Sequence, residues 1–191
     1  GIDAGAAKAL PGVHAVLTFA DLRPLLTSDR IPQALPSGAV RFHVDPFVLA
    51  KDEVTYVGEP VAMVAAESRR VAEDALALIA LDLESLPAVV DPVAGLMAGA
   101  PKARLDCPDN LVAKQSIDYG DVDGAFARAA HRIKERFRLH KGGGHSIETR
   151  GIAVRLDPID DTLTVFVNTQ APHRAKQILV AALGEIGRAH V

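Results

Sequence analysis

The chain has 191 residues, a length that fits one large domain or two small ones. Hydrophobic residues make up 49% and charged residues 24%, and the absence of Trp together with 4% aromatics predicts cores of Ala, Val, Leu and Ile. The net charge of −3 argues against nucleic-acid binding, which needs a basic face, and no apolar run reaches the roughly 20 residues of a membrane span.

The N-terminus and the single cysteine exclude further classes. Residues 1–12 (GIDAGAAKALPG) have neither a charged n-region nor an apolar h-region, so they do not form a signal peptide. We therefore expect a cytoplasmic protein, with the periplasm as the open alternative. Because the chain lacks an initiator Met, we expect it to begin inside a longer protein. Cys107 is alone, which excludes a disulfide framework and a Cys-based structural zinc site within the chain.

The first part of the chain predicts strands separated by turns. Residues 13–19 (VHAVLTF) form a short β-rich run, and residues 21–37 are rich in Pro and polar residues and predict a loop. Two apolar runs at residues 54–57 and 61–65 flank Gly58-Glu59-Pro60, which is a turn signal. We expect both runs to be strands.

A helix and another strand follow. Ser68 can N-cap a helix whose apolar positions form one buried stripe. Residues 81–84 alternate apolar and acidic side chains as a half-buried strand does. The order strand, helix, strand predicts a compact α/β domain. The positions of the stripe are Val71, Ala72, Ala75, Leu76, Leu78 and Ile79.

The composition then shifts between residues 91 and 109, which contain three Pro and two Gly and show no clear period. This pattern predicts a linker. We expect a first domain at residues 1–104, which includes the linker, and a second unit at residues 105–184.

The second unit predicts a helix, a strand and a hairpin. Residues 125–130 predict a short helix, with acidic residues placed where the helix dipole favours them. Residues 133–139 alternate charged and apolar side chains and predict a strand. Residues 152–156 and 163–167 flank a Pro- and Asp-rich turn and predict a hairpin.

A last helix is predicted from Pro172, which suits the first helical position, to a C-cap at Gly184. Residues 185–191 (EIGRAHV) break the pattern, and IGRAHV is also the translation of a common sequencing adapter. We expect these residues to be a non-native tail, and a genuine polar C-terminus is the alternative. The predicted apolar face of the helix comprises Ala175, Ile178, Leu179, Ala182 and Leu183.

Three short motifs are candidate site segments. The glycine run at residues 141–145 (KGGGH) meets neither nucleotide-binding spacing, and His140 and His145 do not have a usual zinc spacing, so we predict no metal ligand here. Glu148 and Arg150 would share one face of a strand, where they could pair with each other or hold a polar ligand.

The third motif, residues 168–173 (NTQAPH), lies between a predicted strand and a predicted helix. Outward-pointing N–H groups at a helix N-terminus and the amide of Gln170 make such a junction suitable for an anion or an oxo group. Simple capping of the helix by Asn168 or Thr169 is the alternative.

The order of these segments resembles the molybdenum hydroxylase large subunit, the family of xanthine dehydrogenase, aldehyde oxidase and carbon monoxide dehydrogenase. Residues 10–22 and 57–92 resemble its α/β hammerhead domain, and residues 120–158 and 163–184 resemble the start of its molybdopterin-binding domain. The fold implied is α/β (α+β). The resemblance implies a molybdenum cofactor and an oxidoreductase that hydroxylates aldehydes or N-heterocycles with oxygen from water, or oxidises carbon monoxide.

The resemblance also implies roles and partners. Gln170 matches a glutamine beside the molybdenum oxo group, and Glu148 and Arg150 match a supporting element of the same site. The implied partners are an iron–sulfur subunit and an FAD-binding subunit, assembled as a dimer of heterotrimers. The family's later glycine-rich segment, substrate loop and general-base Glu are missing here, so we expect this chain alone to be inactive. A non-catalytic docking module derived from the hammerhead domain is the alternative.

Overall fold

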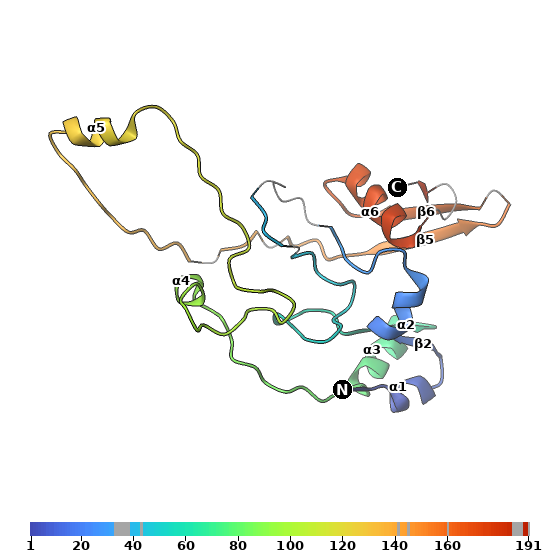
Figure 1. The fold of residues 1–191 in the computed structure, drawn as a ribbon. Helices are drawn as coiled ribbons and strands as arrows, with labels where there is room; N and C mark the ends of the chain where they lie inside the picture. Colours follow the sequence, from blue (N-terminus) through green and yellow to red (C-terminus); the bar gives the residue numbers. More distant parts are fainter. Residues whose placement is uncertain are drawn as a thin grey trace.

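The computed structural model describes residues 1–32, 39–42, 44–140, 142–144, 146–159 and 161–184, and the backbone of residues 189–190. Three small sheets and several short helices are joined by long segments without regular structure (Figure 1). Within the described ranges, no helix is long and apolar enough to cross a membrane. The predicted tail, residues 185–191, lies outside the described residues except for the backbone of β7 (Ala189–His190).

The N-terminal part is built from two strand pairs and two helices. β1 (Ile2–Asp3) pairs with β4 (Ala80–Leu81), and β2 (Val13–Thr18) pairs with β3 (Ala62–Ala66), both antiparallel. Helices α1 (Gly5–Ala9) and α3 (Arg69–Ala77) pack against each other and against the β2–β3 pair. The small core between them confirms the predicted α/β unit. Its buried members are Ala4, Ala7, Val16 and Ala75, with Leu10, Val13, Val64 and Ile79 packed around them.

Helix α3 begins where the sequence predicts it. The Ser68 hydroxyl accepts a hydrogen bond from the Val71 N–H at 3.3 Å, as an N-cap does. Ala75 is fully buried, whereas Leu76 and Leu78 are exposed, which corrects the predicted stripe. The helix ends at Ala77, so Leu78 lies beyond its last turn and does not continue the buried face.

Two strand predictions in this part were wrong or too long. Residues 54–57 form no strand, because the carboxylate of Glu59 accepts hydrogen bonds from the N–H and hydroxyl of Thr55 and closes a local turn. Val57 is consequently fully exposed. The strand predicted at residues 81–84 is limited to β4, because its partner β1 offers only two residues for pairing.

The predicted loop at residues 21–37 begins with a short helical segment. Helix α2 (Phe19–Leu22) starts with a capping box formed by Thr18 and Asp21, and a 3₁₀ turn, η1 (Arg23–Leu25), follows directly. The last five residues of this predicted loop, 33–37, lie outside the described residues.

The predicted linker is a folded turn segment. Helix α4 (Pro92–Gly95) is capped by the Asp91 carboxylate, which accepts from the N–H groups of the second and third residues after it. The side chain of Asn110 then joins three backbone groups, donating to the carbonyls of Gly95 and Pro101 and accepting from the Ala103 N–H. The domain boundary near Arg104 stays a prediction.

Helix α5 (Val122–Arg128) forms earlier in the chain than the predicted 125–130, because the Asp121 carboxylate caps its N-terminus at 2.9 Å from the Gly124 N–H. It lies far from the rest of the molecule on a long excursion of the chain (Figure 1).

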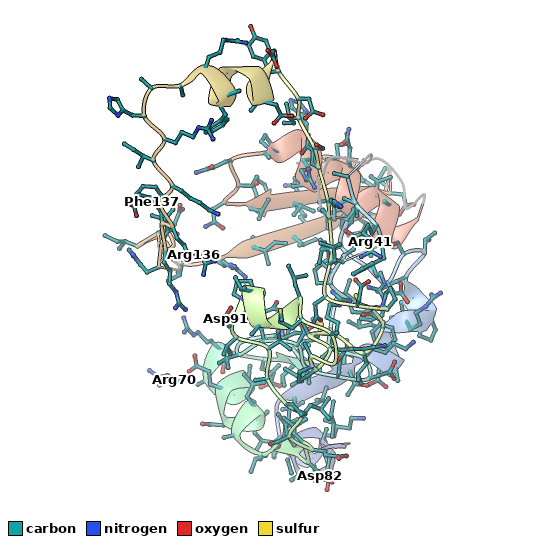
Figure 2. All side chains as sticks on the ribbon, turned by 60° about the vertical axis from the view of Figure 1, so that its left-hand side comes forward. Arg41, Arg70, Asp82, Asp91, Arg136 and Phe137 are labelled. Atoms are coloured by element: carbon teal, nitrogen blue, oxygen red, sulfur yellow. The ribbon has the colours of Figure 1, made fainter. Side chains whose placement is uncertain are left out.

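The strand predicted at residues 133–139 is absent. Figure 2 shows Arg136 and Phe137 on the extended segment that runs from α5 toward β5. Ile133, Phe137 and Leu139 are 85%, 87% and 91% exposed. A strand needs a hydrogen-bonded neighbour, and this segment has none within the described ranges.

The C-terminal part forms the predicted hairpin and helix. β5 (Ile152–Asp157) pairs antiparallel with β6 (Thr162–Val167), and Asp161 takes a left-handed conformation with φ 55° in the turn. Strand β7 pairs parallel with β6. Helix α6 (Pro172–Leu183) half-buries the whole apolar face that its sequence predicts. Its carbonyl at Ala182 accepts from the Thr27 N–H at 2.8 Å, which links the helix to the N-terminal part.

Candidate functional site

The hairpin brings two of the predicted site segments together. Ile152 at the start of β5 is the register partner of Val167 at the end of β6. Because the strands are antiparallel, the residues just before β5 and those just after β6 meet at the same end of the hairpin. Residues 148–151 and 168–170 therefore form one candidate site.

Asn168 joins the two segments directly. Its amide nitrogen donates to the Thr149 carbonyl at 3.0 Å, and its amide oxygen accepts from the Gly151 N–H at 3.2 Å. Helix α6 starts at an N-cap, Ala171, that has no side-chain capping bond, so Asn168 does not cap it. Among the described residues, the Thr169 hydroxyl accepts only from the Ala171 N–H, at 3.1 Å. The capping interpretation of this motif is thus wrong.

A shallow hollow lies at the junction. Its volume of about 330 Å³ is at the lower end of small-molecule sites. The hollow combines a guanidinium and an amide with apolar walls. It is lined by Arg150, Gly151, Ile152, Val167 and Asn168.

The structure places the three predicted site residues on exposed backbone. Glu148 and Arg150 precede β5, so the shared strand face that we expected for them does not exist, and no ion pair joins them within the described ranges. The side chain of Gln170 is exposed and makes no hydrogen bond to any described residue. Because Ala171 is the N-cap, Gln170 does not cap α6 either.

The glycine motif is described only in part. Gly142 donates a backbone hydrogen bond to the His140 carbonyl at 2.9 Å, and Lys141 and His145 lie outside the described residues. No group of three or more His, Cys, Asp or Glu side chains that could hold a metal occurs in the part of the chain that the structure describes.

The donor set decides what the junction could bind. Gln170 offers an unbonded amide, Arg150 a guanidinium without an ion-pair partner among the described residues, and α6 an uncapped N-terminus. These groups suit hydrogen bonding to an oxo group or to an anion. None of these groups is a thiolate or an imidazole, so a metal at this junction would need its ligands from elsewhere.

A cluster of charged residues outside these motifs was missed by the sequence analysis. Asp106 accepts from Arg104 through both carboxylate oxygens, at 2.9 Å each, and from Arg30 at 2.8 Å. The Arg104 hydrogen bonds, together with Arg30, hold the pKa of the Asp106 carboxyl well below its usual range. The short spacing of Arg104 and Asp106 was the available signal, but the contribution of Arg30 depends on the fold.

The cluster borders a second hollow, of about 320 Å³. Arg30 also stacks on Phe47 at 3.8 Å from the ring centroid, and Glu53 accepts from the Leu105 N–H at 2.8 Å. Burial raises the pKa of the neighbouring Cys107 thiol, so this cysteine is not an activated nucleophile. Since the described bonds of Arg30, Arg104 and Asp106 go to one another and to backbone carbonyls, we assign this cluster a structural role.

Two protein families match the chain in consecutive segments. Residues 1–87 match the family described as "Aldehyde oxidase and xanthine dehydrogenase, a/b hammerhead domain". Residues 104–187 match the "Molybdopterin cofactor-binding domain". The second match contains the whole junction formed by residues 148–151 and 168–170.

Individual proteins show the same relationship. The chain is 39% identical over 184 residues to the nicotine 6-hydroxylase large subunit of Paenarthrobacter nicotinovorans, covering 96% of this chain and 22% of the relative. It is 34% identical over 199 residues to the carbon monoxide dehydrogenase large chain of Afipia carboxidovorans, covering 96% and 24%. The crystal structure of quinoline 2-oxidoreductase from Pseudomonas putida 86 matches with a TM-score of 0.80 at 29% identity, covering 96% and 23%. The chain thus spans about a quarter of the length of these proteins.

Proposed function

Since the chain belongs to the molybdenum hydroxylase large-subunit family, we propose that it is the hammerhead domain and the first part of the molybdopterin-binding domain of an oxidoreductase. The proposed reaction is the hydroxylation of an aldehyde or N-heterocycle with oxygen from water, or the oxidation of carbon monoxide. The observation that carries the proposal is the unbonded amide of Gln170, which lies at the β6–α6 junction inside the segment matched by the cofactor-binding family.

The residues at this junction would bind the cofactor and orient it. The molybdenum cofactor, when bound, supplies the redox chemistry. Gln170 would hydrogen-bond the metal's oxygen ligand without adding charge next to it. Arg150 would hold an anionic group of the cofactor at the hollow, and Glu148, two residues earlier, would orient a neighbouring donor. None of these three side chains has an ion-pair or hydrogen-bond partner among the described residues.

The relatives are large subunits of multi-subunit enzymes, one of them named as part of a dehydrogenase complex. We extend this to an iron–sulfur subunit and an FAD-binding subunit as partners, assembled as a dimer of heterotrimers. Electrons would leave the molybdenum site through the iron–sulfur subunit to the flavin. A cytoplasmic location is part of the same proposal.

The test is metal analysis of the large subunit expressed at the full length of its relatives, together with its partner subunits. The purified complex should contain stoichiometric molybdenum and should reduce a dye with an aldehyde, an N-heterocycle or carbon monoxide as electron donor. Growth with tungstate in place of molybdate should abolish turnover but leave the complex assembled. A complex that contains no molybdenum would contradict the proposal.

A further inference from the structure

The side chain of Asn168 uses both ends of its amide on two backbone groups that are two residues apart. The donor end bonds the Thr149 carbonyl, and the acceptor end bonds the Gly151 N–H. Among the side chains of this size, only an amide offers a donor and an acceptor side by side. Aspartate would lose the donor, and leucine would lose both.

The residue enclosed by these two bonds is Arg150. Its neighbours on both sides are fastened to the end of β6, so its backbone position is set by Asn168. No described carboxylate forms an ion pair with the guanidinium of Arg150, which lines the hollow next to the junction. The only bonds that fix residues 149–151 to the β6–α6 junction within the described ranges are those of Asn168 and the β5–β6 ladder that begins at Ile152.

We propose that Asn168 is a positioning residue, which holds Arg150 at the cofactor-binding end of the hairpin through this two-point clamp. The proposal rests on the proposed function, because it assigns Arg150 and Gln170 to one cofactor. In this role Asn168 uses both ends of its amide on backbone groups. It acts by fixing residues 149–151 against the strand end that leads to Gln170.

The clamp is tested first in the 191-residue chain by amide hydrogen exchange. Asn168→Ala should speed exchange of the Gly151 N–H by about tenfold or more, because local opening no longer has to break this bond. Asn168→Asp keeps the acceptor, so it should leave Gly151 closer to the wild type while it loses the bond to the Thr149 carbonyl.

Asn110→Ala is the matched control, since Asn110 clamps Gly95, Pro101 and Ala103 in the same manner away from the junction. It should speed exchange at Ala103 and leave Gly151 unchanged. Gly151 exchange that is equal in wild type and Asn168→Ala would overturn the clamp, and Asn168→Leu, which also removes both bonds, provides the same test if the Ala variant folds poorly.

The positioning role is tested in the complete large subunit with its partners. Asn168→Ala should lower the molybdenum retained after gel filtration by about the same factor as Arg150→Ala, and the double variant should retain no less than Arg150→Ala alone. Asn110→Ala should retain as much molybdenum as the wild type. If the wild-type complex holds molybdenum and Asn168→Ala holds equally much, the inference is overturned while the proposed function stands. If the wild-type complex holds none, the proposed function itself has failed.

Discussion

The guanidinium of Arg30 lies 2.8 Å from the carboxylate of Asp106, although 76 residues separate them in the chain. Arg104 bonds the same carboxylate and also donates to the Val44 carbonyl at 3.0 Å. The segment that follows the predicted boundary at Arg104 is therefore packed on residues 30–53. This cluster contributes to joining the end of the predicted linker to residues 30–53.

We expect Asp106→Asn to destabilise the chain by about 1–2 kcal/mol. This cost lies between the costs of losing an exposed and a buried ion pair, because the Asp106 side chain is 34% exposed and partly screened by solvent. The loss is a drop in the free energy of unfolding, measured by urea denaturation. Asp52→Asn, which affects the exposed contact with Lys51 at 3.5 Å, is the control and should leave stability unchanged. An Asp106→Asn variant as stable as the control would show that the cluster does not contribute.

We also predict how the stability difference between wild type and Asp106→Asn depends on pH. The folded-state pKa of Asp106 is lowered, so its contribution is fully present above the unfolded-state value of about 4 and is lost as pH falls through the folded-state value. The stability difference between wild type and Asp106→Asn should therefore be constant from about pH 5 to 8 and shrink only below about pH 4. If the stability difference disappears near neutral pH, a titratable group other than Asp106 is responsible for it.

Ser68→Ala should cost about 1 kcal/mol, because the Val71 N–H loses its acceptor at the start of α3. Ser68→Asp should keep the cap. Thermal unfolding followed by circular dichroism measures both variants against the wild type. If the melting temperature of Ser68→Asp falls as far as that of Ser68→Ala, the Ser68 hydroxyl has a role other than capping.

Trypsin should cut first within residues 131–139. This segment contains Arg132, Lys134, Arg136 and Arg138, is exposed, and has no regular structure. Arg69 and Arg70 in helix α3 are internal controls and should be cut later. Mass spectrometry of the earliest fragments identifies the first cleavage site. A first cut within residues 91–109 would instead favour the domain boundary predicted near Arg104.

Local signals in the sequence predicted the elements that depend on local chemistry. The Ser68 cap, the acidic N-terminus of α5, the hairpin β5–β6 and the apolar face of α6 all form as expected. At the two helix N-termini, an N–H three residues after the capping side chain supplies the stabilising contact.

Predictions that needed a distant partner were less successful. Residues 54–57 and 133–139 have the composition or alternation of strands, but alternation specifies only a face and not the neighbour that must pair with it. The clamp of Asn168 could not be predicted for the same reason, since its bonds span 17 and 19 residues and depend on the register of the hairpin. Gln170, Glu148 and Arg150 were selected by resemblance, and their roles remain proposals.

The central claim is that Gln170 acts at the molybdenum cofactor, and the most direct measurement is the turnover of a Gln170→Ala variant of the complete large subunit. Gln177→Ala, the same change on the exposed side of α6, is the matched control. Losing a preorganised donor next to developing charge typically lowers turnover by about 10²–10³-fold. We therefore predict a loss of this size for Gln170→Ala, with molybdenum content and melting temperature close to those of the wild type and of Gln177→Ala. Full turnover in a molybdenum-loaded Gln170→Ala enzyme would contradict the claim.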